Sequence, residues 1–309
     1  MIEFKDLRIC FQTRDVLRGI SASVAPGEVC GLIGSNGAGK TTLLRILATV
    51  LRPTMGTIRI AGFSLPDEVH EVRRRIGYMP DHLATYEELR VRSFLEFFAH
   101  LYDLPRASIP GTIADVLQLV DLGPLGSSPI ETLSLGARQR LSLGRVLLHN
   151  PDVLLLDEPV SGLDPRARVE MRTLLAELGR MGKSILISSH VLGDMKDLCD
   201  RYLILEAGQV VFQGTHAEFE ERAAGPPRVL VTVPQKSEQA FAHLCAERFS
   251  EHVVREENGG FAVTLRGPEF TSVDVGRSLH EAGFAIGRLV TAQVDLEEGF
   301  LRLTKGLVT

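Results

Sequence analysis

The sequence predicts an α/β protein in which the strands of an open sheet alternate with helices along the chain. Short apolar runs of strand length, such as residues 153–156 and 184–187, are typical of parallel strands buried on both faces. Segments with helical apolar spacing separate these runs, for example after Pro165. Polar residues follow directly after several strands, at the end where open α/β sheets bind their ligands.

The N-terminal part contains most of the predicted strands. Residues 2–10 alternate roughly between apolar and polar types, and a turn at Pro26-Gly27 ends the next run. Arg52-Pro53 and the following Gly56 interrupt the first helical segment. The predicted elements here are strands at 2–10, 16–24, 29–33, 57–60 and 76–79 and helices at 42–47 and 67–75.

The loop between the strand at 29–33 and the following helix has the pattern Gly-x-x-x-x-Gly-Lys-Thr. Its glycines allow a tight turn that aims backbone N–H groups inward, and the helix N-terminus adds partial positive charge. Lys40 adds a full charge, and the Thr41 hydroxyl is a potential ligand of Mg²⁺. The pattern therefore predicts a nucleoside triphosphate site, formed by Gly34, Ser35, Asn36, Gly37, Ala38, Gly39, Lys40, Thr41 and Thr42.

A mostly helical insert is predicted over about 82–148, because its apolar spacing is helical and Gly, Pro and Ser separate the segments. The expected helices cover 89–101, 113–120 and 137–148. Its most apolar stretch, Phe94 to Phe98, is expected to pack internally. After the insert we expect the strand at 153–156, a helix from Pro165, the strand at 184–187, a helix carrying Val191, Met195 and Leu198, and a hairpin of 202–206 with 210–212.

The sequence of the C-terminal part predicts a separate, smaller α+β domain. Ala223 to Pro227 is rich in Ala, Gly and Pro, so we divide the chain into a domain at 1–222, a linker at 223–228 and an accessory domain at 229–309. The accessory domain has no catalytic constellation and is expected to serve dimer contact or docking, or to hold a regulatory ligand. Its expected elements are strands at 229–233 and 261–265 and helices at 238–249, 273–281 and 296–303.

Composition excludes several classes of protein. The formal net charge of -5 argues against binding of nucleic acid through a broadly basic face. No run of 18 apolar residues occurs, and the N-terminus has no signal-peptide pattern, so we expect a protein on the cytosolic side of the membrane. Cys10, Cys30, Cys199 and Cys245 show no metal-binding spacing, and we expect mainly small core residues.

Three further segments contain residues suited to catalysis or to anion binding. Asp157 and Glu158 follow an apolar strand, so Asp157 is placed to hold Mg²⁺ and Glu158 to polarise a water. His190 ends a neighbouring strand, where it can hydrogen-bond a γ-phosphate and that water. Ser134 and Gly136 open the last helix of the insert, which makes either an ordinary helix cap or an anion site for another subunit's nucleotide.

Together these segments resemble the ATPase subunit of an ABC transporter over about residues 1–222. The resemblance implies a P-loop NTPase ABC cassette with an antiparallel β subdomain and a helical insert. The loop around Lys40 resembles Walker A, and Asp157-Glu158 resembles Walker B with its catalytic glutamate. It further implies that His190 is the switch histidine, that Asp164 belongs to the D-loop, and that Phe11 and Val16 contact adenine.

The resemblance also implies a head-to-tail dimer with a second copy or a paralogous ATPase. Each ATP would lie between one Walker A loop and the partner's signature, here Ser134, Leu135, Gly136 and Ala137. The ending Asp295 to Thr304 is similar to separate-chain ATPases of the drug-export and sodium-efflux type. Such a subunit drives a transmembrane permease in another chain, from the cytoplasmic face of the membrane.

Two positions depart from the family pattern. The signature has Leu135 and Ala137 in place of the usual Gly and Gln, although Ser134 and Gly136 remain. Asp81 replaces the Q-loop glutamine and is expected to ligate Mg²⁺ with a side chain one methylene shorter. The expected function is therefore ATP hydrolysis with Mg²⁺ that drives transport in the direction of export.

Two other functions are compatible with part of this pattern. Soluble relatives in DNA repair carry long coiled-coil inserts and those in translation carry two cassettes, whereas this chain has one cassette, no heptad insert and no basic excess. A sensor that binds nucleotide without hydrolysis would not need Glu158 and His190. Neither alternative fits as well as the transporter ATPase, which requires no nucleic acid.

Overall fold

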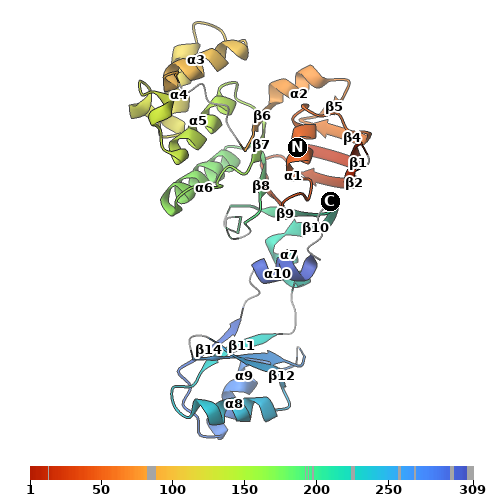
Figure 1. Cartoon of the computed structure of the whole chain (residues 1–309), viewed down its shortest axis with the longest axis vertical. Coiled ribbons are helices and arrows are strands. Elements are labelled where there is room, and N and C mark those ends of the chain that lie inside the picture. Colours follow the sequence, from red (N-terminus) through yellow and green to blue (C-terminus); the bar gives the residue numbers. More distant parts are fainter. Residues whose placement is uncertain are drawn as a thin grey trace. The chain divides into compact units, whose positions relative to one another are not determined.

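A six-stranded sheet forms the centre of the N-terminal unit in this computed structural model (Figure 1). Its strand order is β10-β9-β3-β8-β7-β6, and all neighbours are parallel except β9 and β10. This confirms the predicted α/β class. The strands are β3 (Val29–Ile33), β6 (Ile76–Met79), β7 (Val153–Asp157), β8 (Ser184–Ser189), β9 (Arg201–Glu206) and β10 (Gln209–Thr215).

The structure describes residues 1–12, 14–81, 88–191, 193, 195–196, 198–223, 227–256, 259–267, 269–292 and 296–304. The chain divides into two compact units, one of Met1–Phe219 with Leu303–Thr309 and one of Glu220–Arg302. Part of the predicted linker lies outside the described residues, and Arg228 at its end already begins a strand. Among the described residues, no helix is long and apolar enough to cross a membrane.

A second, antiparallel sheet has the order β2-β1-β4-β5. Its strands are β1 (Ile2–Phe11), β2 (Arg14–Val24), β4 (Met55–Ile60) and β5 (Phe63–Leu65), and α2 (Val69–Arg75) follows. One apolar core joins this sheet to α1 (Lys40–Leu47) and to the central sheet, with fully buried side chains such as Phe4, Leu43 and Leu155. The short β5 was missed from the sequence because three residues show no periodicity.

The helices α3 (Val91–Leu101), α4 (Ile109–Leu119) and α5 (Leu135–Leu147) gather on one side of the central sheet (Figure 1). Phe94 and Leu95 are fully buried, which agrees with the expected internal packing, whereas Phe97 is 44% exposed. Helix α5 begins two residues earlier than predicted because the Ser134 side chain accepts a hydrogen bond from the N–H of Ala137.

Helix α6 (Pro165–Arg180) connects β7 to β8 and begins where the sequence placed it. The helix predicted after His190 is wrong for the part of 191–198 that the structure describes, where residues 193, 195, 196 and 198 lie in turns. Apolar spacing at three positions was too little evidence for a helix. Of the four cysteines, only Cys30 and Cys199 are buried as expected, whereas Cys10 and Cys245 are exposed.

The C-terminal unit contains a βαββαβ arrangement, the ferredoxin-like pattern, with strand order β12-β13-β11-β14. Its elements are β11 (Arg228–Thr232), α8 (Ser237–Ala246), β12 (Ser250–Arg255), β13 (Phe261–Leu265), α9 (Ser272–Glu281) and β14 (Arg288–Ala292). Helix α7 (His216–Ala223) precedes it and α10 (Leu296–Leu303) follows. Strands β12 and β14 were not predicted, because both are edge strands and carry exposed residues on both faces.

His149, which follows α5, joins the helical insert to the central sheet. Its ring Nε2 donates a hydrogen bond of 2.8 Å to the carbonyl oxygen of Ile76, and its ring centroid lies 4.3 Å from that of Tyr102. Nδ1 is buried without a hydrogen-bond partner in the described part of the chain. Burial lowers the pKa of His149, because protonation would add a charge and an unpaired buried N–H.

This environment predicts acid sensitivity. In the unfolded chain His149 takes up a proton below about pH 6.5, whereas in the folded chain it stays neutral to lower pH. The stability contributed by His149 is therefore complete above about pH 6.5 and is lost as the pH falls below that value.

We expect His149→Gln, which keeps a donor for Ile76, to show a smaller loss of denaturation midpoint between pH 7 and pH 5 than wild type. His70→Gln, at an exposed histidine of α2, is the control, and equal pH responses in all three proteins would contradict the prediction.

Candidate functional site

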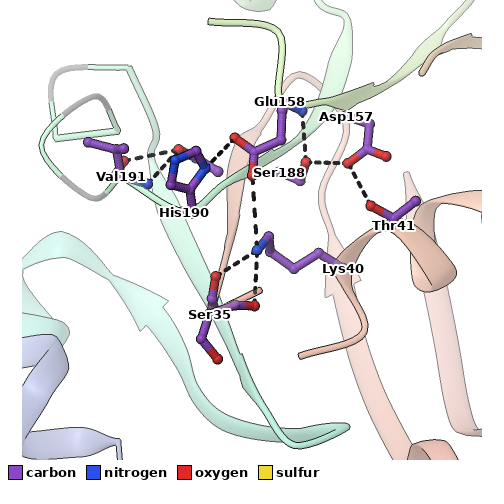
Figure 2. A network of polar contacts seen from close by, with 10 residues as sticks. Ser35, Lys40, Thr41, Asp157, Glu158, Ser188, His190 and Val191 are labelled. Carbon is purple, nitrogen blue, oxygen red and sulfur yellow. Dashed lines mark hydrogen bonds and ion pairs between the residues drawn. The ribbon is translucent and has the colours of Figure 1, made fainter. Parts of the chain in front are cut away.

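The loop between β3 and α1 holds Lys40 in a buried position. Its ammonium Nζ donates to the carbonyl oxygens of Gly34 at 2.6 Å and Ser35 at 3.3 Å, and lies 4.0 Å from Oε1 of Glu158 (Figure 2). Only 7% of Lys40 is exposed, so burial lowers the pKa of its ammonium group, while Glu158 and Asp157 act in the opposite direction. The Lys40 ammonium group is therefore largely removed from water and is held in a position where it can pair with an anion.

Asp157, at the end of β7, is almost completely buried and accepts two hydrogen bonds on one carboxylate oxygen. The donors are the hydroxyls of Thr41 at 3.2 Å and of Ser188 at 2.7 Å (Figure 2). The Ser188 hydroxyl also accepts from the N–H of Glu158 at 2.9 Å. Ser188 was not among the predicted site residues, although the parallel pairing of β7 with β8 places it directly opposite Asp157.

Glu158 connects the phosphate loop to His190. The Nδ1–H group of His190 donates a hydrogen bond of 2.9 Å to Oε2 of Glu158, while Oε1 of Glu158 faces Lys40 (Figure 2). The backbone of Glu158 has φ of +50°, an uncommon value for a residue with a side chain. Its side chain is only 14% exposed, whereas that of His190 is 45% exposed. This geometry joins the two predicted catalytic residues.

A cavity of about 600 Å³ opens beside these groups. The predicted residues that line it are Phe11, Val16, Ser35, Asn36, Gly37, Gly39, Lys40, Thr41, Thr42, Asp81 and Glu158. Gly34 and Ala38 belong to the backbone turn beneath it, and Asp157 lies behind Thr41. Gln12 and Arg14 also line the cavity and were missed. Arg14 pairs with Phe11 across the β1–β2 hairpin, a signal that only the strand register reveals.

The segment from Ser134 to Ala137 does not line this cavity. Ser134 caps α5, and Asp164 caps α6 by accepting from the N–H groups of Arg166 and Ala167 at 3.0 Å. A Cβ atom at Gly136 would lie 2.9 Å from the Cβ of Ala167, so the two helix starts are closely packed. Leu135 is 50% exposed. The structure therefore separates the segment from Ser134 to Ala137 from the Lys40 cavity of the same chain.

Comparisons with known proteins agree with this arrangement. A family model described as ABC transporter matches residues 17–161. The chain is 34% identical over 291 residues to the daunorubicin resistance ATP-binding protein of Streptomyces coeruleorubidus, covering 94% of this chain and 92% of the relative. It is 32% identical to a Nod factor export ATP-binding protein of Burkholderia thailandensis, covering 98% and 96%.

A solved ATP-binding subunit of an ABC transporter superposes with a TM-score of 0.64 at 32% identity, covering 72% of this chain and 92% of that chain. The chain belongs to the ABC transporter ATP-binding family. It is an ATP-binding protein and an ATPase of this family.

In this ABC ATPase, one glycine fixes strand β2 relative to the phosphate loop. Gly208, in the β9–β10 turn at φ +75°, donates from its N–H to the Ala38 carbonyl and accepts from the N–H of Arg18. A Cβ atom at Gly208 would lie 2.3 Å from the carbonyl oxygen of Val16. The same carbonyl would lie 3.2 Å from a Cβ atom at Gly39. The ABC ATPase therefore needs glycine at both positions to bring β2 against the phosphate loop.

Gly208→Ala tests this contact. The added methyl group must displace the backbone of Val16, so we expect a severalfold loss of ATP affinity together with a loss of folding stability of about 1–3 kcal/mol. Gly62→Ala is the matched control, because Gly62 also has positive φ (+91°) but a Cβ atom there meets no atom within 4 Å. Calorimetric ATP titration and denaturant unfolding measure both effects. If both variants lose affinity equally, the close approach at Val16 does not position the nucleotide.

Proposed function

We propose that this ABC ATPase binds ATP with Mg²⁺ in the Lys40 cavity and hydrolyses it to drive transport by a permease in a separate chain. The observation that carries the proposal is the network of Lys40, Thr41, Asp157, Glu158 and His190 beside the cavity. It supplies a cation for phosphate oxygens, hard oxygen ligands for a metal and a carboxylate for a water, in one place.

ATP would lie with its triphosphate on the backbone N–H groups of the loop Gly34–Thr42 and on Lys40. Its adenine would stack on Phe11, which is 44% exposed and has Val16 beside it on the cavity wall. Gln12 and Arg14 line the same end of the cavity and would contact the base or ribose.

The residues present fit Mg²⁺, since they offer three oxygen-bearing side chains in or next to the cavity. Thr41 and Asp81 line the cavity, and Asp157 contacts Thr41 from behind. Such hard ligands suit Mg²⁺, and the bound ion would supply positive charge next to the phosphate groups. Asp81 would hold this ion with a carboxylate where the family has an amide.

Glu158 would accept a proton from the attacking water, and His190 would orient Glu158 and the water. The Nδ1–H of His190 fixes one carboxylate oxygen of Glu158, while Lys40 faces the other. These two contacts hold the carboxylate in one orientation, as a general base requires.

Two copies, or this chain and a paralogue, would assemble head to tail, so that Ser134 to Ala137 of one closes the cavity of the other. This is supported by the separation of the signature from the cavity within one chain and by its capped, partly exposed helix start. Daunorubicin resistance and Nod factor export in relatives' names support export at the cytoplasmic face of a membrane.

Glu158→Gln tests the catalytic proposal. Glutamine keeps the shape and an acceptor for His190 but cannot take a proton, so phosphate release is expected to fall about 100-fold or more while ATP is still bound. With ATP and Mg²⁺ the variant is expected to accumulate as a dimer in light scattering. Glu177→Gln on α6, which removes an exposed carboxylate that does not line the cavity, is the control. A wild-type chain that binds ATP without hydrolysis would favour a nucleotide sensor and refute the proposal.

Asp81→Asn tests the metal assignment. The variant removes one negative charge at constant length, so we expect hydrolysis to require severalfold more Mg²⁺ for half-maximal rate, with ATP affinity in the absence of metal unchanged or improved. Asp81→Gln restores the family residue and is expected to recover part of the loss. Asp103→Asn, in the exposed turn after α3, is the control. An unchanged Mg²⁺ requirement in Asp81→Asn would remove Asp81 from the metal site.

A further inference from the structure

Among the residues that the structure describes in the C-terminal unit, helices cover one face of the sheet and leave the other face open. Helices α8 and α9 lie on the same side of it (Figure 1), and their core includes Val231, Phe261 and Val263. The alternation of each strand sends the intervening residues to the other face. The open face is defined by three cross-strand rows, read from β12 through β13 and β11 to β14: His252–Thr264–Arg228–Ala292, Val254–Ala262–Leu230–Val290 and Glu256–Gly260–Thr232–Arg288.

The middle row is apolar across all four strands. Val254 and Val290, on the edge strands, are 44% and 40% exposed. Ala262 is buried between its taller neighbours Val254 and Leu230. A continuous apolar row across an open sheet face is typical of a surface that packs against another surface.

The open face has a ridge beside a trough. Strand β13 and the residue before it contribute only small residues to this face, namely Gly260, Ala262 and Thr264, and all three are buried. The neighbouring strand β11 contributes the larger Arg228, Leu230 and Thr232. A face of this shape is complementary to itself when it is rotated so that the ridge of one copy meets the trough of the other.

We propose that this open face packs against the same face of a second copy of the chain, about a two-fold axis parallel to the strands between β11 and β13. Such an axis places each β11 over the partner's β13 and each β12 over the partner's β14, as in an aligned sheet-on-sheet packing. Leu230 then meets Ala262, and Val254 meets Val290.

The same axis pairs opposite charges. Glu256 and Arg288 lie at opposite ends of one row, so each Glu256 meets Arg288 of the second copy, twice in the dimer. In the first row His252 meets the small Ala292, and Arg228 meets Thr264. No like charges face each other in this arrangement. The complementarity of both size and charge favours a second copy over an unrelated partner.

The area limits the strength of this contact. Four strands about 4.8 Å apart and about five residues long present roughly 300 Å² per copy, below the ~800 Å² per partner of a standard interface. The contact is therefore weak alone and gains strength where another contact already holds two copies together. It uses neither ATP nor the signature, so it does not rest on the proposed function.

Cross-linking of the full chain without ATP and Mg²⁺ tests the geometry. In a Cys10→Ser/Cys245→Ser background, Val254→Cys/Val290→Cys places two thiols about 14 Å apart within one copy, too far for an ethylene-spaced bis-methanethiosulfonate to bridge. In the proposed dimer each thiol at 254 faces one at 290, so we expect a covalent dimer. Either single variant faces valine and is expected to remain mostly monomeric. Equal dimer yields in single and double variants, or no dimer in the double variant, would overturn the proposal.

Charge exchange gives an independent test by sedimentation at high protein concentration, again without nucleotide. Glu256→Arg and Arg288→Glu each bring like charges together twice and are expected to weaken self-association about tenfold. The combined Glu256→Arg/Arg288→Glu variant restores both pairs and is expected to regain wild-type association. Glu281→Arg, an exposed change on α9, controls for net charge. If the combined variant is as weak as the single ones, or none differs from wild type, the open face binds something other than its own copy.

Discussion

The parallel pairing of β3, β7 and β8 is the constraint on which the candidate site depends. Because the three strands run in one direction, their carboxyl ends meet at one edge and deliver the phosphate loop, Asp157-Glu158 and Ser188 to His190 together. Thr41 of the phosphate loop and Asp157 are 116 positions apart along the chain. Strand β7 makes this arrangement possible. Its apolar residues are buried on both faces of the sheet, so Asp157 at its carboxyl end has almost no exposure.

Burial also sets the electrostatics of the site. Lys40 loses most of its hydration, which alone would favour the neutral amine, and two loop carbonyls and the nearby carboxylates offset that loss. Asp157 is stabilised by hydroxyl donors from α1 and β8 rather than by water. The groups are therefore oriented before any ligand arrives, which lowers the reorganisation that phosphoryl transfer requires.

The molecule separates its functions in space. The Lys40 cavity and the capped start of α5 are different surfaces of one unit, which favours completion of the site by another subunit. The C-terminal unit adds a sheet face whose small residues on β13 lie beside larger ones on β11. A contact between subunits at the nucleotide site and a contact at this sheet face would reinforce each other, because formation of one raises the effective concentration for the other. In this view the accessory unit tunes assembly and leaves the chemistry to the cassette.

The sequence by itself determined the α/β class, the phosphate loop and the identities of Asp157, Glu158 and His190, because strict local patterns encode them. It also placed most buried strands and long helices, whose apolar periodicity is strong. It did not reveal Ser188, Arg14 or Gly208, since their roles arise from strand register and from contacts between distant segments. Edge strands β12 and β14 were missed because solvent on both faces removes the alternation. Only the tertiary structure decided which residues share the cavity and which face of the C-terminal sheet stays open, because pairing between strands leaves no local mark in the chain.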